Sequence, residues 1–353
     1  MPVAGFTRFR KRQWGFQGSN SSVIATKAVA TRVIPWRGVP SVNLNYTFPE
    51  QDEGSLHRVS APSQRAVDIT ATAAGPLNYN DAPYLFSAGL IGGITPTGGG
   101  ADKTWAFQPT SLTASPLGMF TEEYGDDVTT DWWQLLGIVA ESFTLTGNDD
   151  MGPLEVSANL RGASWKSTGS TDHANSGTVP TAGLSVDADP TPVYLGDCEL
   201  FINSTSGAIG TTKITDALHS LTLSVTNNLD LKRYANGSNT RFAVQAYGQG
   251  EQAITLALTF AKTAQTVGLL SENDLWFDDT ATKRYCELRF TSPRIITGVI
   301  PYSLVIRLPL FYTIRDDGEI GNNTTLTLTG TAVYDSGLGY AARAVVVNTL
   351  ASL

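Results

Sequence analysis

The residues best suited to chemistry in this 353-residue chain are its acids, which occur in adjacent clusters. One cluster is the stretch TEEYGDDVTTDWW (121–133), and two others are the pairs Asp149–Asp150 and Asp316–Asp317. Paired carboxylates could act as the acid and base of a glycosidase, or could bind calcium through oxygen ligands. No Asp-x-Asp-x-Asp-Gly pattern is present to favour calcium. The simplest interpretation of each acidic residue is that it is a solvated turn residue. A further interpretation concerns the acids together, as negative charge placed where a polyanion must pass.

Other catalytic and cofactor patterns are missing from the sequence. The three histidines, His57, His173 and His219, are scattered, and neither His-x-x-x-His nor Cys-x-x-Cys occurs. The glycine-rich stretch 92–104 lacks the frame of a phosphate-binding loop, and 248–253 leads into a strand pattern instead of a helix. We therefore expect a protein that is not an enzyme, with no catalytic residues, no metal site and no cofactor.

Composition favours β structure and argues against a nucleic-acid-binding protein. Charged residues make up 16% of the chain and the net charge is -8. Tight binding to DNA or RNA by counterion release needs a surplus of Lys and Arg. Two cysteines are too few for a disulfide scaffold. The N-terminal basic run is not followed by an apolar stretch, so we expect no secretory signal, no membrane span, and folding in a reducing cytoplasm.

The same strand pattern occurs twice. QRAVDITATAAG (64–75) and EQAITLALTFAK (251–262) both alternate apolar and small polar residues, as half-buried strands do. Other elements recur around them in the same order. The matched pairs are 42–48 with 221–227, the short helices 77–91 and 267–277, 103–111 with 284–292, 137–150 with 305–317, and 154–165 with 325–335.

This shared order predicts a tandem duplication, although any two β-sandwiches look alike at this level of detail. The predicted fold is mainly β, with two tandem β-sandwich or half-barrel domains, each with one short α-helix and a long β-hairpin. The domains span 1–165 and 193–353. Residues 166–192, rich in Ser, Thr, Gly and Pro, read as a linker or surface loop. The expected hairpin turns are 147–153 and 315–323.

The organisation resembles the tail tube (major tail) proteins of long-tailed, non-contractile bacteriophages. No single motif carries the resemblance, which rests on an ordered series of strands and turns distributed between residues 14 and 332. The stretches concerned are 14–36, 42–59, 66–93, 131–165, 220–238 and 292–332.

The resemblance implies a structural virion protein whose sheets join edge to edge into a barrel around a channel. Such rings stack into a tail tube that conducts genomic DNA without binding it specifically. A ring usually holds six such domains, so a duplicated chain needs three copies, forming a pseudo-hexamer. The resemblance also implies assembly in the virion tail after synthesis in the host cytoplasm, with tape measure, tail tip and terminator proteins as partners. The alternatives are another phage virion β protein, such as a decoration or baseplate component, or a carbohydrate-binding β-sandwich with exposed Trp.

Alternation and the resemblance together suggest which residues line the channel. The candidate lumen-facing residues are Asp68, Thr70, Thr72, Glu155, Ser157, Asn159, Thr255, Thr259, Thr325, Thr327 and Thr329. When the two halves are matched by sequence, Asp68 and Thr70 correspond to Thr255 and Ala257. In the same way, Glu155, Ser157 and Asn159 correspond to Thr325, Thr327 and Thr329. A neutral or acidic wall would let DNA slide, whereas a basic wall would hold it.

Charged residues outside these strands are candidates for contacts between rings or subunits. They are Arg8, Arg10, Lys11, Arg12, Glu122, Glu123, Asp149, Asp150, Asp316 and Asp317. The basic run from Arg8 to Arg12 could bridge to an acidic patch on the next ring or could be a frayed terminus.

Overall fold

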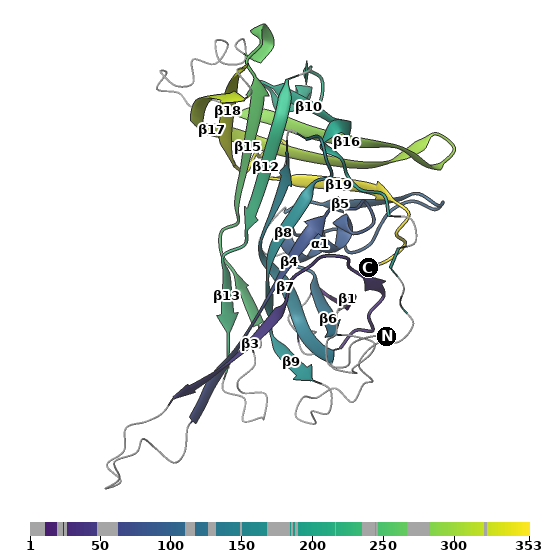
Figure 1. Ribbon diagram of the computed structural model, residues 1–353, viewed down its shortest axis with the longest axis vertical. Coiled ribbons are helices and arrows are strands. Elements are labelled where there is room, and N and C mark those ends of the chain that lie inside the picture. The colour runs from purple at the N-terminus through teal and green to yellow at the C-terminus, as the bar shows by residue number, and fades with distance from the viewer. Residues whose placement is uncertain are drawn as a thin grey trace, which may run out of the picture.

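The computed structural model is an elongated, mainly antiparallel β structure (Figure 1). It describes residues 11–19, 24, 27–47, 63–109, 117–125, 132–148, 150–167, 184, 186–187, 190–215, 217–234, 244, 246–266, 283–320 and 323–353. The β-rich prediction is confirmed.

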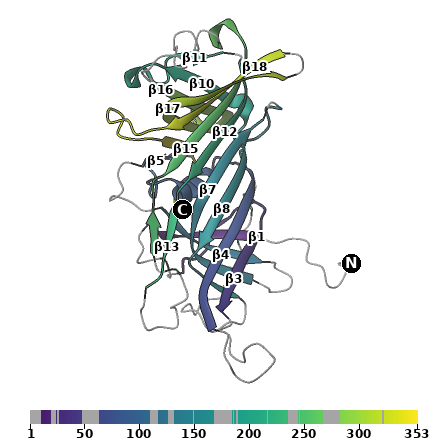
Figure 2. The ribbon, with the colours of Figure 1, turned by 90° about the vertical axis from the view of Figure 1, so that its left-hand side faces the viewer.

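The largest feature is an antiparallel sheet of eight described strands, called here the eight-stranded sheet. Its first four strands, in spatial order, are β3 (Pro40–Thr47), β4 (Ser63–Pro76), β8 (Glu155–Gly162) and β7 (Trp132–Gly147). Its last four are β12 (Leu218–Thr226), β15 (Ala253–Ala261), β18 (Asn323–Ala332) and β17 (Ile300–Ile320). Pairing of β7 with β12 joins the two sets, and Figure 2 shows β15, β12, β7, β8, β4 and β3 running side by side.

Two smaller groups of strands pack behind this sheet. One has the order β2 (Arg32–Val33), β1 (Lys11–Gly18), β6 (Met119–Gly125), the first part of β7, and β9 (Ser164–Ser167). The other has the order β11 (Lys213–Ile214), β10 (Cys198–Asn203), β16 (Arg284–Thr297), the first part of β17, β19 (Arg343–Asn348) and β5 (Lys103–Phe107).

The long strands β7 and β17 therefore each belong to two groups. Each has an irregularity where it passes from one group to the other, at Glu141 in β7 and at Thr313 in β17. An extra residue in one strand of an antiparallel pair bends that strand and increases its twist. The bulges thus let one continuous strand close over both sides of the core.

Alternation explains why these segments form half-buried strands. In β15 the side chains of Ile254, Leu256, Leu258 and Phe260 are buried, whereas those between them are partly exposed. The main buried apolar cluster takes side chains from both halves of the chain, including Phe143 and Leu223 on the paired strands β7 and β12. The two predicted domains therefore share a continuous core in the described residues.

The helix α1 (Ala82–Gly89) lies inside this core, and all of its side chains are buried. Pro83 in its first turn suits a helix start, where the missing N–H has no intrahelical partner. A Cβ at Gly89 would lie 2.5 Å from the Phe143 ring, so glycine lets the helix approach β7 closely. The predicted helix within 77–91 is confirmed, and the one at 267–277 lies outside the described residues.

The two predicted long hairpins are present as β7–β8 and β17–β18. The second is longer than expected, because pairing continues to Ile320 opposite Asn323. Asp316 and Asp317 therefore lie within β17 and not in a turn. Short 3-10 turns at Leu195–Asp197 and Ser206–Ala208 and a small ladder of β13 (Leu229–Lys232) with β14 (Ala246–Gln249) complete the described elements.

One predicted match between the halves is wrong. Residues 103–111 were matched with 284–292, but β5 pairs with β19 at the end of its group, whereas β16 lies between β10 and β17. The strand of the first half in the position most like that of β16 is β6. It lies between β1 and the long strand β7, as β16 lies between β10 and the long strand β17. Both segments alternate apolar and polar residues, and alternation alone does not identify the strands that pair with them.

Candidate functional surface

One face of the eight-stranded sheet is rich in hydroxyl groups. Residues directly opposite each other in an antiparallel pair lie on the same face, so the register defines the surface. One row across five strands consists of Ser157, Thr144, Ser224, Thr255 and Thr331. Neighbouring rows add Asn159, Ser142 and Thr226 on one side and Glu155, Thr146, Thr222 and Thr329 on the other. We call this surface the hydroxyl face.

The hydroxyl face is open to solvent in the single chain. Its side chains are exposed or half-exposed, whereas residues between them on the same strands, such as Leu145, Leu223 and Leu256, are buried. The face is held by short polar contacts between strands. Thr144 Oγ1 lies 3.4 Å from Ser224 Oγ, Thr259 Oγ1 lies 3.0 Å from Thr327 Oγ1, and Asn159 donates to Ser142 at 3.1 Å.

Most of the candidate lumen-facing residues lie on this face. These are Asp68, Thr70, Thr72, Glu155, Ser157, Asn159, Thr255, Thr259, Thr327 and Thr329, all at least partly exposed. The exception is Thr325, which is 2% exposed. It lies opposite Gly318, where an added Cβ would come within 3.0 Å of its Oγ1, so its side chain fills the space that glycine leaves.

Charges on the hydroxyl face are largely paired. Arg161 forms two hydrogen bonds to Glu141, from Nε and Nη2, each 3.0 Å long. Asp68 accepts a hydrogen bond from Arg233 at 2.8 Å and one from Asn45 at 2.7 Å. The Arg161 guanidinium is therefore already occupied by a carboxylate of the same surface, and Glu155 adds negative charge.

Three candidate contact residues are internal, which corrects their assignment. Arg12, Glu122 and Glu123 are at most 2% exposed. Arg12 Nε donates to Glu122 Oε1 at 2.9 Å, and Trp14 Nε1 donates to Glu122 Oε2 at 3.2 Å. Glu123 accepts hydrogen bonds from Gln13 and Gln134. Charged residues are usually found at the surface, and a sequence pattern predicts them there. Here the pairing of β1 with β6 brings opposite charges together in the core.

The remaining candidate contact residues lie nearer the surface or outside the described residues. Arg8, Arg10 and Asp149 are outside the described residues, and Lys11 is partly buried in β1. Asp150 is exposed and accepts a hydrogen bond from the Gly152 N–H at 2.9 Å. Asp316 and Asp317 are exposed in β17, where Asp317 is paired with Lys262 and Arg315.

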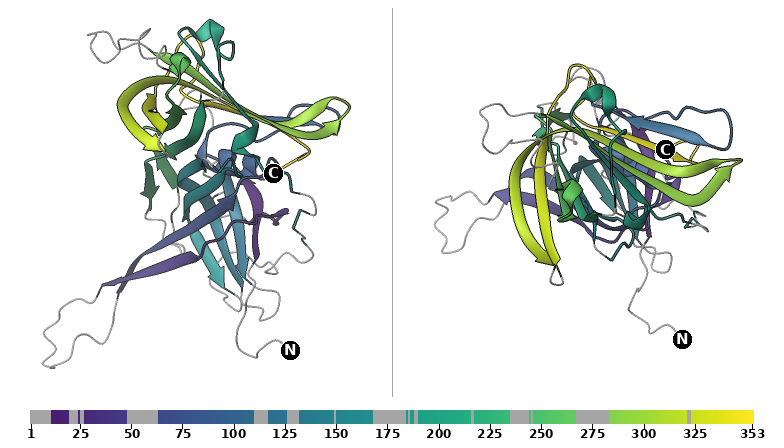
Figure 3. Two further views of the ribbon diagram at one scale, coloured as in Figure 1. Left: turned by 45° about the horizontal axis from the view of Figure 1, so that its top comes forward. Right: turned by 90° about the horizontal axis from the view of Figure 1, so that it is seen from above.

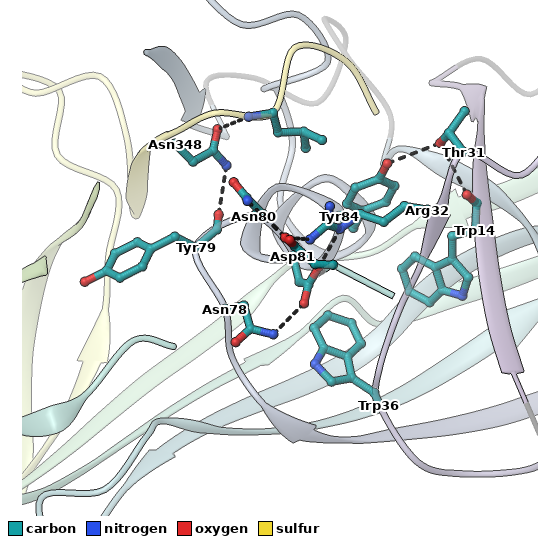
Figure 4. Close-up of polar contacts among 12 residues, drawn as sticks. Trp14, Thr31, Arg32, Trp36, Asn78, Tyr79, Asn80, Asp81, Tyr84 and Asn348 are labelled. Carbon is teal, nitrogen blue, oxygen red and sulfur yellow. Dashed lines mark hydrogen bonds and ion pairs between the residues drawn. The ribbon is translucent and has the colours of Figure 1, made fainter. Parts of the chain in front are cut away.

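Sequence reasoning missed a polar cluster at the start of α1 (Figure 4). Asp81 accepts hydrogen bonds from Arg32 Nε at 2.6 Å and from Asn78 Nδ2 at 2.8 Å. Burial raises the pKa of Asp81, against the lowering effect of the Arg32 charge. Beside it, Asn348 donates to the Tyr79 carbonyl at 2.8 Å and so ties the C-terminal strand to the first half. The available signal was Asp81, an acid within the predicted helical stretch 77–91.

The charged and amide side chains of this cluster are paired within the chain and hold the start of the helix in place. Among the described residues, no group of three or more His, Cys, Asp or Glu side chains could bind a metal ion. No helix in the described part of the chain is long and apolar enough to cross a membrane.

Comparison with protein-family models finds no matching family, and comparison with curated proteins finds no significant match.

Proposed function

We propose that this chain is a structural protein of a phage tail tube, and that its two halves arose by tandem duplication. The supporting observation is the agreement of two strand ladders. The first half has the order β3-β4-β8-β7 and the second has β12-β15-β18-β17. In each half the last of these strands is the long one that also enters a second group.

The agreement extends to single residues. The bulge at Glu141 lies between Leu160 and Asn159 of β8, and the bulge at Thr313 lies between Gly330 and Thr329 of β18. With the bulges aligned, Ser157 corresponds to Thr327 and Asn159 to Thr329, as the sequence predicted. The next strand follows from the register: Thr70 corresponds to Thr255 and Thr72 to Ala257. The sequence match of Asp68 with Thr255 was therefore two residues out of register.

A sheet built in this way needs partners at its edges. Among the described residues, β3 pairs with β4 alone, and residues 311–320 of β17 pair with β18 alone. Open edges are a liability for a monomer, and closure into a ring removes them. Three copies of an eight-stranded sheet give a barrel of about 24 strands, more than the 16–18 that leave an aqueous channel in porins. Stacked rings of this kind would form the tube.

The hydroxyl face suits the inner wall of such a channel. Each Lys or Arg that contacts DNA releases counterions and adds a salt-sensitive grip. On the hydroxyl face Arg161 is paired with Glu141, and the uncharged positions are mostly Thr and Ser. DNA would then pass without being held. Tape measure, tail tip and terminator proteins remain expected partners, and the virion tail the expected location.

The alternative functions have less support. A carbohydrate-binding sandwich would use exposed Trp side chains, but of the six Trp in the described residues Trp14, Trp36, Trp105 and Trp132 are at most 3% exposed, and Trp133 and Trp165 are partly buried with ring centroids 5.9 Å apart. Their burial indicates a packing role. A decoration or baseplate protein could share the fold but would not stack into open-ended rods.

Negative-stain electron microscopy of the concentrated chain, alone and with a tail tip complex as nucleus, tests the proposal. We expect rings or rods with a central hole. Particles that remain solid or monomeric under both conditions would contradict the proposal, and binding of glycans by such monomers would favour the lectin alternative.

A further inference from the structure

We propose that β17 of one copy pairs with β3 of the next in the same register that joins β7 to β12 within the chain. The inference rests on the proposed ring and names the residues that close it. The junction inside the chain and the one between chains would then be two versions of one interface. The internal version is visible in the structure and serves as the template.

The internal junction has a simple register. β7 and β12 run antiparallel, with Thr146 opposite Thr222, Thr144 opposite Ser224, and Ser142 opposite Thr226. It ends with a hydrogen bond of 2.8 Å from the Asn227 N–H to the Glu141 carbonyl, at the bulge. The bulge therefore marks where the junction stops.

Correspondence between the halves transfers this register to the open edges. Thr70 corresponds to Thr255, so Ser41, opposite Thr70, takes the place of Ser224, opposite Thr255. The aligned bulges place Asp316 where Thr144 lies. Ser41 of one copy is then opposite Asp316 of the next. By the same rule, Val42 lies opposite Arg315 and Asn43 opposite Ile314.

The chemistry of the two edges fits this pairing. Where the internal junction has two hydroxyls in contact, the Ser41 hydroxyl would donate to the Asp316 carboxylate, which is a stronger, charge-assisted hydrogen bond. Apolar side chains also stand exposed at the end of the proposed junction: Leu44 on β3, which takes the place of Asn227, is 37% exposed, and Ile314 on β17, opposite Asn43, is 55% exposed. Pairing would remove part of this apolar surface from water.

Strand direction also agrees. Eight consecutive antiparallel strands leave the two outer strands running in opposite directions, so β17 meets the next β3 in antiparallel fashion. Figure 3 shows the β3–β4 hairpin, in purple and blue, projecting from the body of the molecule. Residues 313–320 of β17 are exposed as well, so both edges are accessible in the single chain.

Pro40 limits backbone pairing at the start of the β3 edge. Arg37 and Ala74 exchange both backbone hydrogen bonds, and such pairs alternate along an antiparallel ladder. Continuing the register to Pro40 opposite Ala71 places the Pro40 nitrogen toward the open edge. Proline has no N–H to offer there, which blunts the edge against unselective pairing. In the proposed register Pro40 takes the place of Leu223, so the junction between chains lacks one backbone hydrogen bond of the internal junction, and Val42 is the first residue of β3 whose N–H points to the open edge.

Cysteine cross-linking tests the register directly. Within one chain, Ser41 and Asp316 lie on opposite outer strands, seven strand spacings or about 34 Å apart along the sheet, so they cannot form an intrachain disulfide. The variants are Ser41→Cys and Asp316→Cys, mixed, assembled and oxidised with copper phenanthroline. A matched control mixes Ser41→Cys with Ile320→Cys, which is four residues further along the same edge. Each single variant alone and the wild-type chain control for the native cysteines.

We expect a disulfide-linked dimer from the Ser41→Cys and Asp316→Cys mixture, at least about tenfold more abundant than from the shifted mixture, because disulfides need close Cβ atoms. Equal or stronger cross-linking of the shifted mixture would overturn the register. Hollow rings that give no cross-link at either position would also overturn the register but leave the ring intact. If the wild-type chain forms no ring, the proposed function itself fails.

Discussion

The hydroxyl oxygens of Thr144 and Ser224 lie 3.4 Å apart across the boundary between the first and second halves of the chain. They belong to β7 and β12, the two strands that merge the ladders of both halves into one sheet. The contact lies on the solvent-facing side, above a buried layer that includes Leu145 and Leu223. The halves thus meet through a continuous sheet, with polar contacts on one face and apolar packing on the other.

The amide of Asn227 fixes this boundary from inside. Its Nδ2 donates to the carbonyls of Gly89 and Ala140 at 3.1 and 2.8 Å, and its Oδ1 accepts from Gln252. We expect Asn227→Ala to lower the free energy of unfolding by about 1–3 kcal/mol, because buried polar groups lose their partners. Urea denaturation measures the change, with Glu251→Ala at an exposed nearby position as a control. A loss no larger than that of the control would show that Asn227 does not hold the boundary.

The buried pair Arg12–Glu122 is predicted to be a stability element. Glu122→Ala leaves the Arg12 guanidinium buried and without its carboxylate, so we expect a loss of about 3–5 kcal/mol. Glu155→Ala, at an exposed position, should change the free energy by less than about 0.5 kcal/mol. Thermal unfolding of both variants provides the comparison. A mild effect of Glu122→Ala on folding with a strong effect on assembly would instead restore the original contact assignment.

Asp335 is expected to make the free energy of unfolding depend on pH. Lys283 and Tyr285 each donate to Oδ2 at 2.8 Å, and the N–H groups of Gly337 and Leu338 donate to Oδ1. The Lys283 hydrogen bond, followed by those from Tyr285 and Leu338, lowers the pKa of Asp335 from 3.8 to about 2. A depressed carboxyl pKa contributes stability that is present above the unfolded-state value and is lost as the pH falls toward the folded-state value.

We therefore expect Asp335→Asn to be less stable than wild type by about 1–2 kcal/mol at neutral pH. The difference should shrink between pH 4 and pH 2, where the wild-type carboxylate takes up its proton. Urea denaturation across this range measures it, with Asp150→Asn as an exposed control. A difference that stays constant down to pH 2 would rule out the charge as the cause.

The wall of the proposed channel should tolerate neutral changes but not basic ones. We expect assembled wild-type tubes to retain duplex DNA weakly and with little dependence on salt. A triple variant, Thr72→Lys with Ser157→Lys and Thr255→Lys, places nine lysines in a ring of three chains and should bind DNA with a slope of log affinity against log salt of about -0.9 for each lysine that contacts a phosphate, or about -8 if all nine do. The same positions changed to Gln are the matched control. Steep salt-dependent binding by wild-type tubes would contradict a non-retentive wall.

The strands of the large sheet were readable from sequence because period-2 alternation is a local signal. The stretches that became β4, β15, β7, β8 and β18 were all found, and with them the correct face for Ser157 and Asn159. The register was less accessible. Runs such as Thr-Ala-Thr-Ala repeat every two residues, so a shift by two keeps every side chain on its face while changing its partner. That is why Asp68 was matched with Thr255.

The burial of Arg12, Glu122 and Glu123 could not be read from the sequence, because it depends on the long-range pairing of β1 with β6. Local patterns also gave no sign that β5 and β16 occupy different places in the fold. Thr325 shows the same limit on a smaller scale, since its burial depends on the glycine opposite.

Cryo-electron microscopy of the assembled chain is the most direct test of the central claim, that equivalent sheets from both halves enclose a channel. We predict a ring of three chains with about 24 strands, in which the hydroxyl face, with Thr144 and Ser224, lines the bore. An assembly in which this face is covered by protein or points outward, or in which arginine and lysine line the bore, would contradict the account.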